Sequence, residues 1–158
     1  MSAADLMLLA CLVLAGLWSG LLLTLTTILH PMFRAMDGPA FARQMRRFLP
    51  VARHAPANWI IVTGLVLAPA AALAALEAGS TACALTAGGL ACCIAGPLLV
   101  SRLLAEPNYA VILAWDPAAM PPDWRRTRGR YLLFNWVRAA ATWTAFGLFT
   151  AAAYSAWR

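Results

Sequence analysis

Four long apolar runs are the feature that most constrains what this chain can fold into. A hydrocarbon core of roughly 30 Å is crossed by about 20 apolar residues of helix, and the runs extend over about residues 4–29, 57–76, 82–104 and 131–157. With 63% hydrophobic and 11% charged residues, the chain lies far outside the composition of a soluble domain. Its mean hydropathy of +0.73 points the same way. The sequence therefore predicts an all-α integral membrane protein, a four-helix bundle.

The first run is predicted to be a retained span and not a cleavable signal peptide. No Lys or Arg precedes it, whereas Asp5 does, and its apolar stretch exceeds the roughly 7–15 residues of a signal sequence. No internal repeat, low-complexity tract or linker divides the chain. Residues 1–158 are therefore expected to form a single domain.

The distribution of arginine predicts the orientation in the membrane. All twelve basic residues are arginines. Ten of them lie in or beside two of the connections: Arg34, Arg43, Arg46, Arg47 and Arg53 in the first, and Arg102, Arg125, Arg126, Arg128 and Arg130 around the third. By the positive-inside rule both connections are cytoplasmic, so both termini are extracytoplasmic in a multi-pass protein of the cell membrane. Topology thus accounts for the net charge of +6, and nucleic acid is not an expected partner.

The first connection contains a helical pattern. Phe41, Met45 and Phe48 recur at i, i+4 and i+7, while three arginines lie mostly on the other side. This pattern predicts a short interfacial helix in the first cytoplasmic loop.

Small residues and prolines predict how the helices pack. Gly16 and Gly20 form a small-xxx-small pattern that lets helix backbones approach closely. Pro69 and Pro97 fall within the second and third runs, where each removes a backbone hydrogen bond and tends to bend a helix. We expect these bends to open a cavity in a compact bundle.

Polar side chains gather at one depth of the predicted bundle. Arg138 lies about 12 Å beyond Arg130 at 1.5 Å per residue, and Asn135 shares its helix face. An ionisable group at that depth usually faces the bundle interior and finds a partner, and Glu106 is the expected counter-ion. The full set near the cytoplasmic ends is His30, His54, Asn58, Arg102, Glu106, Asn108, Asn135 and Arg138.

Each of these residues also has a simpler interpretation. Arg138 could extend its long side chain to the lipid headgroups. His30, at a predicted helix end, could be favoured there by the helix dipole, and His54 could be solvated in its loop. The asparagines could join helices by hydrogen bonds, and Trp136 could be a packing or lipid-anchoring residue instead of a platform for an aromatic substrate.

Motifs of soluble enzymes are missing from the sequence. It contains no phosphate-binding glycine loop, GxSxG, HExxH or dinucleotide fingerprint. The four cysteines form no CxxC pair, which argues against a quinone-coupled thiol oxidase.

The order of polar and aromatic residues in the last third resembles that of a known family. The ordered residues are Glu106, Pro107, Asn108, Trp115, Pro121, Trp124, Arg128, Asn135 and Arg138. Together with the His30–Pro31 step and Asn58, they resemble the anthrone oxygenase-like family of small four-helix membrane proteins, long catalogued as a domain of unknown function. The resemblance covers the whole chain in helix number and loop lengths.

The resemblance implies oxidation of polyketide-derived anthrones, or related electron-rich phenolics, with molecular oxygen as co-substrate. An anthrone is a weak carbon acid whose enolate reacts with oxygen. A catalyst therefore needs a base, donors or a cation that hold the anion, and an apolar slot for the flat rings.

Residue roles follow from the same resemblance. His30 or His54 would be the base, and Arg138 would hold the enolate oxygen. The other expected site residues are Asn135 and Glu106 in the catalytic set and Asn58, Asn108 and Trp136 in the substrate-binding set. With a carboxylate, the two histidines could instead form a copper or non-haem iron site.

The competing class is a non-enzymatic membrane protein, either a transporter subunit or a structural accessory subunit. Proton-coupled exporters place an acidic residue in the middle of a span, whereas Glu106 lies near an end. This difference favours the enzyme, which would need a small aromatic substrate and the lipid bilayer as partners. Whether copies of the chain form a homo-oligomer stays open.

The predicted topology can be tested by cysteine labelling in intact cells. In a variant without the native cysteines, a cysteine beside Arg125 should resist a membrane-impermeant maleimide, because that segment is predicted to be cytoplasmic. A cysteine among residues 77–81 should react and serves as the positive control. Strong labelling beside Arg125 would reverse the orientation.

Overall fold

Helices make up nearly all of the structure, a computed structural model that describes residues 2–158. The α-helices are α1 (Ala3–Thr24), α2 (His30–Ala35), α3 (Gly38–His54), α4 (Pro56–Ala75), α5 (Thr81–Cys93), α6 (Glu106–Ala114) and α7 (Trp124–Ala156). Two π-helical segments join them, η1 (Leu25–Leu29) and η2 (Ile94–Ala105). Within residues 2–158 there is no strand, only one isolated bridge between Asp116 and Ala119. The prediction of an all-α protein is confirmed.

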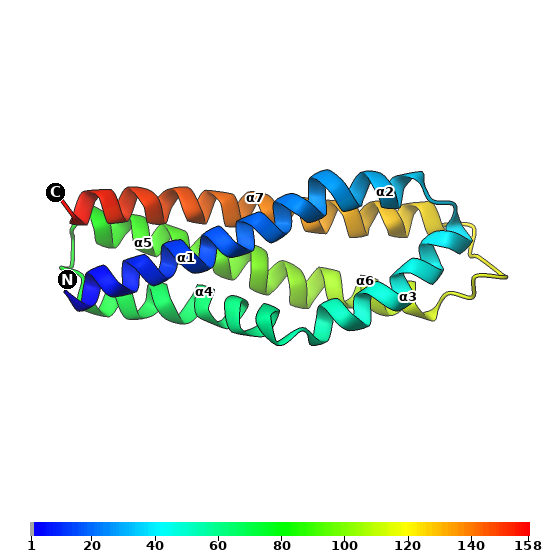
Figure 1. The fold of residues 1–158 in the computed structure, drawn as a ribbon, viewed down its shortest axis with the longest axis horizontal. Helices are drawn as coiled ribbons and strands as arrows, with labels where there is room; N and C mark the ends of the chain where they lie inside the picture. The colour runs from blue at the N-terminus through cyan, green and yellow to red at the C-terminus, as the bar shows by residue number, and fades with distance from the viewer. Residues whose placement is uncertain (1) are drawn as a thin grey trace.

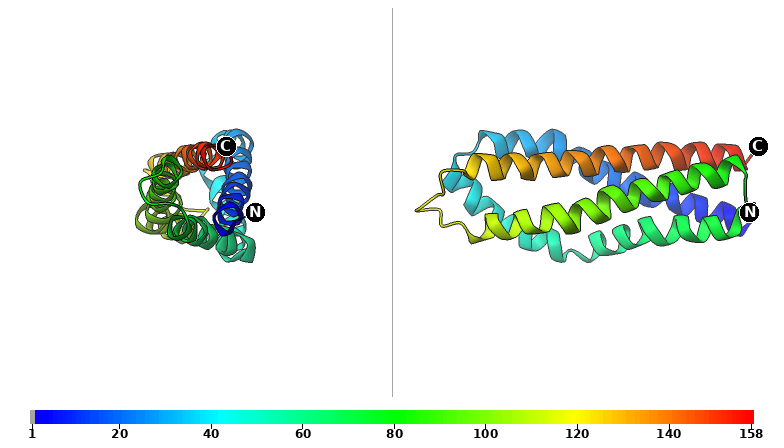
Figure 2. Two further views of the ribbon diagram at one scale, coloured as in Figure 1. Left: turned by 90° about the vertical axis from the view of Figure 1, so that its left-hand side faces the viewer. Right: turned by 180° about the vertical axis from the view of Figure 1, so that it is seen from behind.

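The helices form an elongated bundle (Figure 1). α1, η1 and α2 are one continuous rod, as are α5, η2 and α6. α1 and α5 each pack against both α4 and α7, which closes a ring in the end view of Figure 2. Both termini lie at one end, and the α2–α3 and α6–α7 connections lie at the other (Figure 1). The two arginine-rich segments therefore share one end of the bundle.

Three helical rods are long and apolar enough to cross a membrane by length and composition: Ala3–Ala35, Pro56–Ala75 and Thr81–Ala114. α7 is not among them, although the sequence predicts a span over residues 131–157. α7 carries several arginines in its first turns and much Ala and Thr beyond them, so its composition is less apolar than that of the other rods.

The π-helical segments accommodate prolines within the long rods. A proline ring clashes with the carbonyl four residues earlier in an α-helix. Directly before Pro31, the N–H of His30 donates to the carbonyl of Leu25, five residues earlier. The N–H of Glu106, before Pro107, makes the same kind of bond to Ser101. These wider turns let both rods continue with their backbone groups bonded, as lipid demands.

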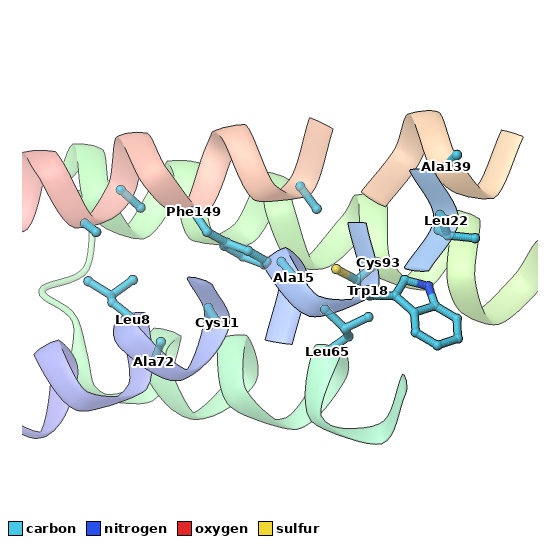
Figure 3. Close-up of a cluster of buried hydrophobic side chains, with 13 residues drawn as sticks. Leu8, Cys11, Ala15, Trp18, Leu22, Leu65, Ala72, Cys93, Ala139 and Phe149 are labelled. Atoms are coloured by element: carbon cyan, nitrogen blue, oxygen red, sulfur yellow. The ribbon is translucent and has the colours of Figure 1, made fainter. Parts of the chain in front are cut away.

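Small residues bring α5 and η2 close to α7. An added Cβ at Gly89 would lie 2.3 Å from Cε1 of Phe149, and one at Gly96 would lie 2.4 Å from Cβ of Ala141. Phe149 belongs to a buried cluster that runs along the bundle, with Trp18 near one end (Figure 3). The half of the bundle nearer the termini is therefore tightly packed.

α3 is present where a helix was predicted, but protein covers its apolar face. Phe41 and Met45 are 0% exposed and pack with Phe33, Trp115 and Tyr131. Figure 1 shows α3 slanting along the bundle, continuing the side formed by α4. The apolar residues that suggested contact with lipid instead fill a second core between α2, α6 and α7.

The close approach of η2 to α7 predicts an effect on stability. Gly96→Ala should lower the free energy of unfolding by about 1–3 kcal/mol, because its Cβ would overlap Ala141 and the helices would have to separate. Gly147→Ala is the matched control, since nothing lies within 4 Å of its Cβ position, and it should be neutral or stabilising. Unfolding in mild detergent measures both. Equal stability of the two variants would contradict the packing.

Candidate ligand cavity

A cavity of about 730 Å³ lies between the helices of the bundle. Its walls come from α1 and η1, from the α3–α4 junction, from η2 and α6, and from α7. Most of the wall is apolar and includes Trp18, Val62, Val66 and Leu98. The space is large enough for a small polycyclic molecule.

The predicted site residues divide between this cavity and other places. On the wall are His54, Asn58, Glu106, Asn135 and Arg138. His30, Asn108 and Trp136 are not among the lining residues. Of the two prolines expected to open the cavity, Pro97 is on the wall, whereas Pro69 is buried in α4 away from it.

Arg138 is held by neutral groups. Its Nη1 donates to Oδ1 of Asn135 at 3.1 Å and to the hydroxyl of Tyr109 at 3.3 Å. Its guanidinium carbon lies 5.8 Å from the centre of the Trp18 ring. The amide of Asn135 donates at 2.9 Å to the carbonyl of Tyr131, one turn earlier. Both ends of the Asn135 amide are therefore engaged, and Asn135 serves to position Arg138.

Glu106 is not the counter-ion of Arg138, contrary to expectation. Its carboxylate pairs with Arg53 of α3 at 2.5 Å. This is the one ion pair formed among residues 2–158. The expected pairing came from similar depth alone, whereas α3 brings its own arginine to the carboxylate. Arg138 thus has no acidic partner in the described chain.

Three buried polar atoms around the cavity lack a hydrogen-bond partner in the described chain: Nε1 of Trp18, Oγ of Ser101 and Nε of Arg138. All three side chains line the cavity, and Trp18 is only 3% exposed. Burying such a group without a partner costs about 1–3 kcal/mol. All three atoms are hydrogen-bond donors, and the side chains that carry them line the cavity.

The two histidines have different surroundings. His30 is 0% exposed, and its ring centre lies 6.0 Å from that of Tyr131 and 6.4 Å from that of Trp136. Both of its ring nitrogens are buried without a partner among the described residues. His54 is exposed, and its Nδ1 lies 2.8 Å from the carbonyl of Pro50. Because a carbonyl only accepts, Nδ1 of His54 is the donor in this contact.

The remaining predicted residues make structural contacts. The Asn58 amide donates to the carbonyl of Ala52 at 2.8 Å and fastens the α3–α4 junction. The buried Asn108 amide donates to the carbonyl of Thr127 at 3.3 Å and ties α6 to α7. Trp136 lies partly exposed on the outside of the bundle. Of these three side chains, Asn58 lines the cavity.

The residues do not fit the copper or iron site considered from the sequence. Within residues 2–158, no three His, Cys, Asp or Glu side chains come together in a way that could hold a metal ion. His54 lines the cavity and His30 does not. The two histidines therefore do not combine with a carboxylate into a ligand set.

The sequence pattern missed four residues of the site: Trp18, Ser101, Tyr109 and Tyr131. Trp18 and Ser101 could have been found from the sequence, because each places a hydrogen-bond donor within a long apolar run. Tyr109 and Tyr131 each stand at the start of a short apolar stretch of the sequence, where a tyrosine is read as a packing residue, so only the structure identifies them.

Comparisons with protein-family models, with curated proteins and with solved structures find no match for the chain.

The unpartnered hydroxyl of Ser101 leads to a test of the cavity wall. Ser101→Ala should leave the free energy of unfolding unchanged or raise it, because no protein hydrogen bond is lost. Thr86→Val is the matched control. It removes a buried hydroxyl bonded to the carbonyl of Ala82 and should cost about 1 kcal/mol. A larger loss for Ser101→Ala, measured by unfolding in detergent, would mean that Ser101 has a protein partner.

Proposed function

We propose that the chain is a four-span membrane protein in which α7 crosses the bilayer beside the three more apolar rods. α7 runs the length of the bundle and packs on α1 and α5 (Figure 1), so a bilayer that surrounds those rods also surrounds α7. Its inner face does not meet lipid and can carry small and polar residues such as Ala139, Thr142 and Ala145. The arginine-rich end would face the cytoplasm and the termini the outside.

The cavity would then lie in the cytoplasmic half of the membrane and bind a flat, apolar aromatic molecule with an ionisable oxygen. The observation that carries this proposal is Arg138, a cation on an apolar wall with no acidic partner in the described chain. Arg138 is partly buried, and an anionic oxygen would compensate a charge that is withdrawn from water without a partner. The side chains of Trp18 and Ser101 line the same space.

Apolar residues on the cavity wall suit a substrate that arrives from lipid. Leu21, Val51 and Leu67 line the cavity and are also among the exposed large apolar side chains. An aromatic molecule dissolved in the bilayer could pass between them without entering water.

Taken with the resemblance, this site supports oxidation of an anthrone-like compound. A base removes a proton from the methylene group of the substrate, and the resulting enolate is stabilised at Arg138. The enolate carbon then reacts with molecular oxygen, and the methylene becomes a carbonyl with release of one water molecule, so that no external reductant is needed. His54 is the proposed base, since it lines the cavity and the contact of Nδ1 with the carbonyl of Pro50 leaves Nε2 for the substrate. Asn135 and Tyr109 would position Arg138.

Oxygen uptake with a model anthrone tests the proposal, after subtraction of the rate without protein. Arg138→Lys should lose about 10²-fold or more in rate although the charge stays, because an ammonium lacks the planar set of donors. His54→Gln should lose about 10²-fold, since general base catalysis contributes at least this much.

His30→Phe is the control for both variants, because position 30 does not line the cavity and a phenyl ring keeps the packing against Tyr131 and Trp136, so the variant should stay active. Full activity in folded Arg138→Lys protein would contradict the proposed role. A protein that binds the anthrone without taking up oxygen would instead support the non-enzymatic class, a carrier or accessory subunit.

A further inference from the structure

A second pocket lies on the outside of the bundle, separate from the cavity. It has a volume of about 540 Å³ and is formed by the end of α2 and the first turns of α7. It shares no lining residue with the cavity. The residues that matter here are Arg34, Arg125, Arg128, Gly129, Leu133 and Trp136.

Three arginines, Arg34, Arg125 and Arg128, line this pocket, and no acidic residue does. The one ion pair formed among residues 2–158 joins Arg53 to Glu106, elsewhere in the bundle. Like charges held close together repel one another, so a bound anion would relieve the cost. Arg34 and Arg125 are exposed and therefore accessible to such an anion.

Arg128 holds the shape of the pocket. Its Nη1 donates to the backbone carbonyls of Phe33, Arg34 and Met36, at 3.1, 3.3 and 2.7 Å. Its guanidinium carbon lies 4.6 Å from the centre of the Trp124 ring. These bonds satisfy carbonyls at the end of α2, where no further helical turn follows. Arg128 therefore fixes α2 against α7. Arg34 and Arg125 are the exposed cations, and the guanidinium carbon of Arg125 lies 4.9 Å from the centre of the Trp124 ring.

The other end of the pocket is apolar. Leu133 and Trp136 are 58% and 39% exposed, and they follow Arg128 along α7 toward the middle of the bundle. Trp136 lies about 12 Å along the helix from Arg128 at 1.5 Å per residue. The pocket thus has cations near the arginine-rich end and exposed apolar side chains nearer the middle of the bundle. This order matches that of headgroup and acyl chain in a lipid leaflet.

We propose that this pocket binds an anionic phospholipid, with the phosphate between Arg34 and Arg125 and an acyl chain along Leu133 and Trp136. A basic pocket between helices on the cytoplasmic side suits such a headgroup. Free phosphate would engage only the cationic end, whereas a lipid fills the whole pocket. The assignment needs a membrane around the bundle, but it does not depend on any activity in the cavity.

Native mass spectrometry of the full-length protein in neutral detergent tests the site by titration with phosphatidylglycerol and with phosphatidylcholine. Phosphatidylglycerol should bind about tenfold more tightly or better. Arg34→Gln and Arg125→Gln should each weaken its binding about fivefold, the effect of one charge at an anionic surface. Arg126→Gln is the matched control, because Arg126 is exposed on the same turn but does not line the pocket.

Gly129→Leu separates the pocket from general charge attraction. Nothing lies within 4 Å of the Cβ position of Gly129, so a leucine fits the fold and occupies pocket space while every charge remains. It should reduce phosphatidylglycerol binding at least as strongly as Arg34→Gln.

Several results would overturn the lipid site. The first is equal affinity for both lipids. The second is an equal loss of phosphatidylglycerol affinity in Arg126→Gln and Arg34→Gln, and the third is unchanged phosphatidylglycerol affinity in Gly129→Leu. Displacement of phosphatidylglycerol by equimolar inorganic phosphate would show that phosphate alone is the ligand.

Discussion

The structure depends on keeping backbone N–H and C=O groups bonded within each helix. In hydrocarbon an unpaired backbone group costs several kcal/mol, so a chain this apolar must be helical. Its prolines conflict with that rule, because each lacks an N–H and crowds the turn before it. η1 and η2 resolve the conflict by shifting the bond before Pro31 and Pro107 to the carbonyl five residues earlier. Both segments contribute to the cavity wall, and π turns of this kind are common at functional sites.

The sequence predicted more of the fold than of the site. Length and apolarity alone indicated helices, and the spacing of Phe41 and Met45 indicated α3. Which surface those two side chains would meet was not predictable, because a lipid-facing stripe and a core-facing stripe have the same period. Protein covers them, since α3 packs on α6 and side chains of α2 and α7 join the same buried cluster.

The predicted depth of a residue in the membrane showed which residues would line the same cavity, but it did not show which of them would form an ion pair. It grouped Glu106, Asn135 and Arg138, and all three line one cavity. It could not show that Arg53 would reach Glu106 first, because that contact joins two helices whose relative rotation is fixed only by packing. His30 illustrates the same limit, since its place before a proline set its depth and left the direction of its ring undetermined.

Gly96 links the tightly packed part of the bundle to the cavity. Besides meeting Ala141, an added Cβ there would lie 3.6 Å from the carbonyl oxygen and 3.7 Å from Cα of Arg138. The absence of a side chain at residue 96 thus sets how near the backbone of Arg138 can come to η2. Because the guanidinium stands at the end of a long side chain, its reach into the cavity is measured from that backbone position. The size of one residue on a neighbouring helix therefore governs where the positive charge is presented, without touching the charge itself.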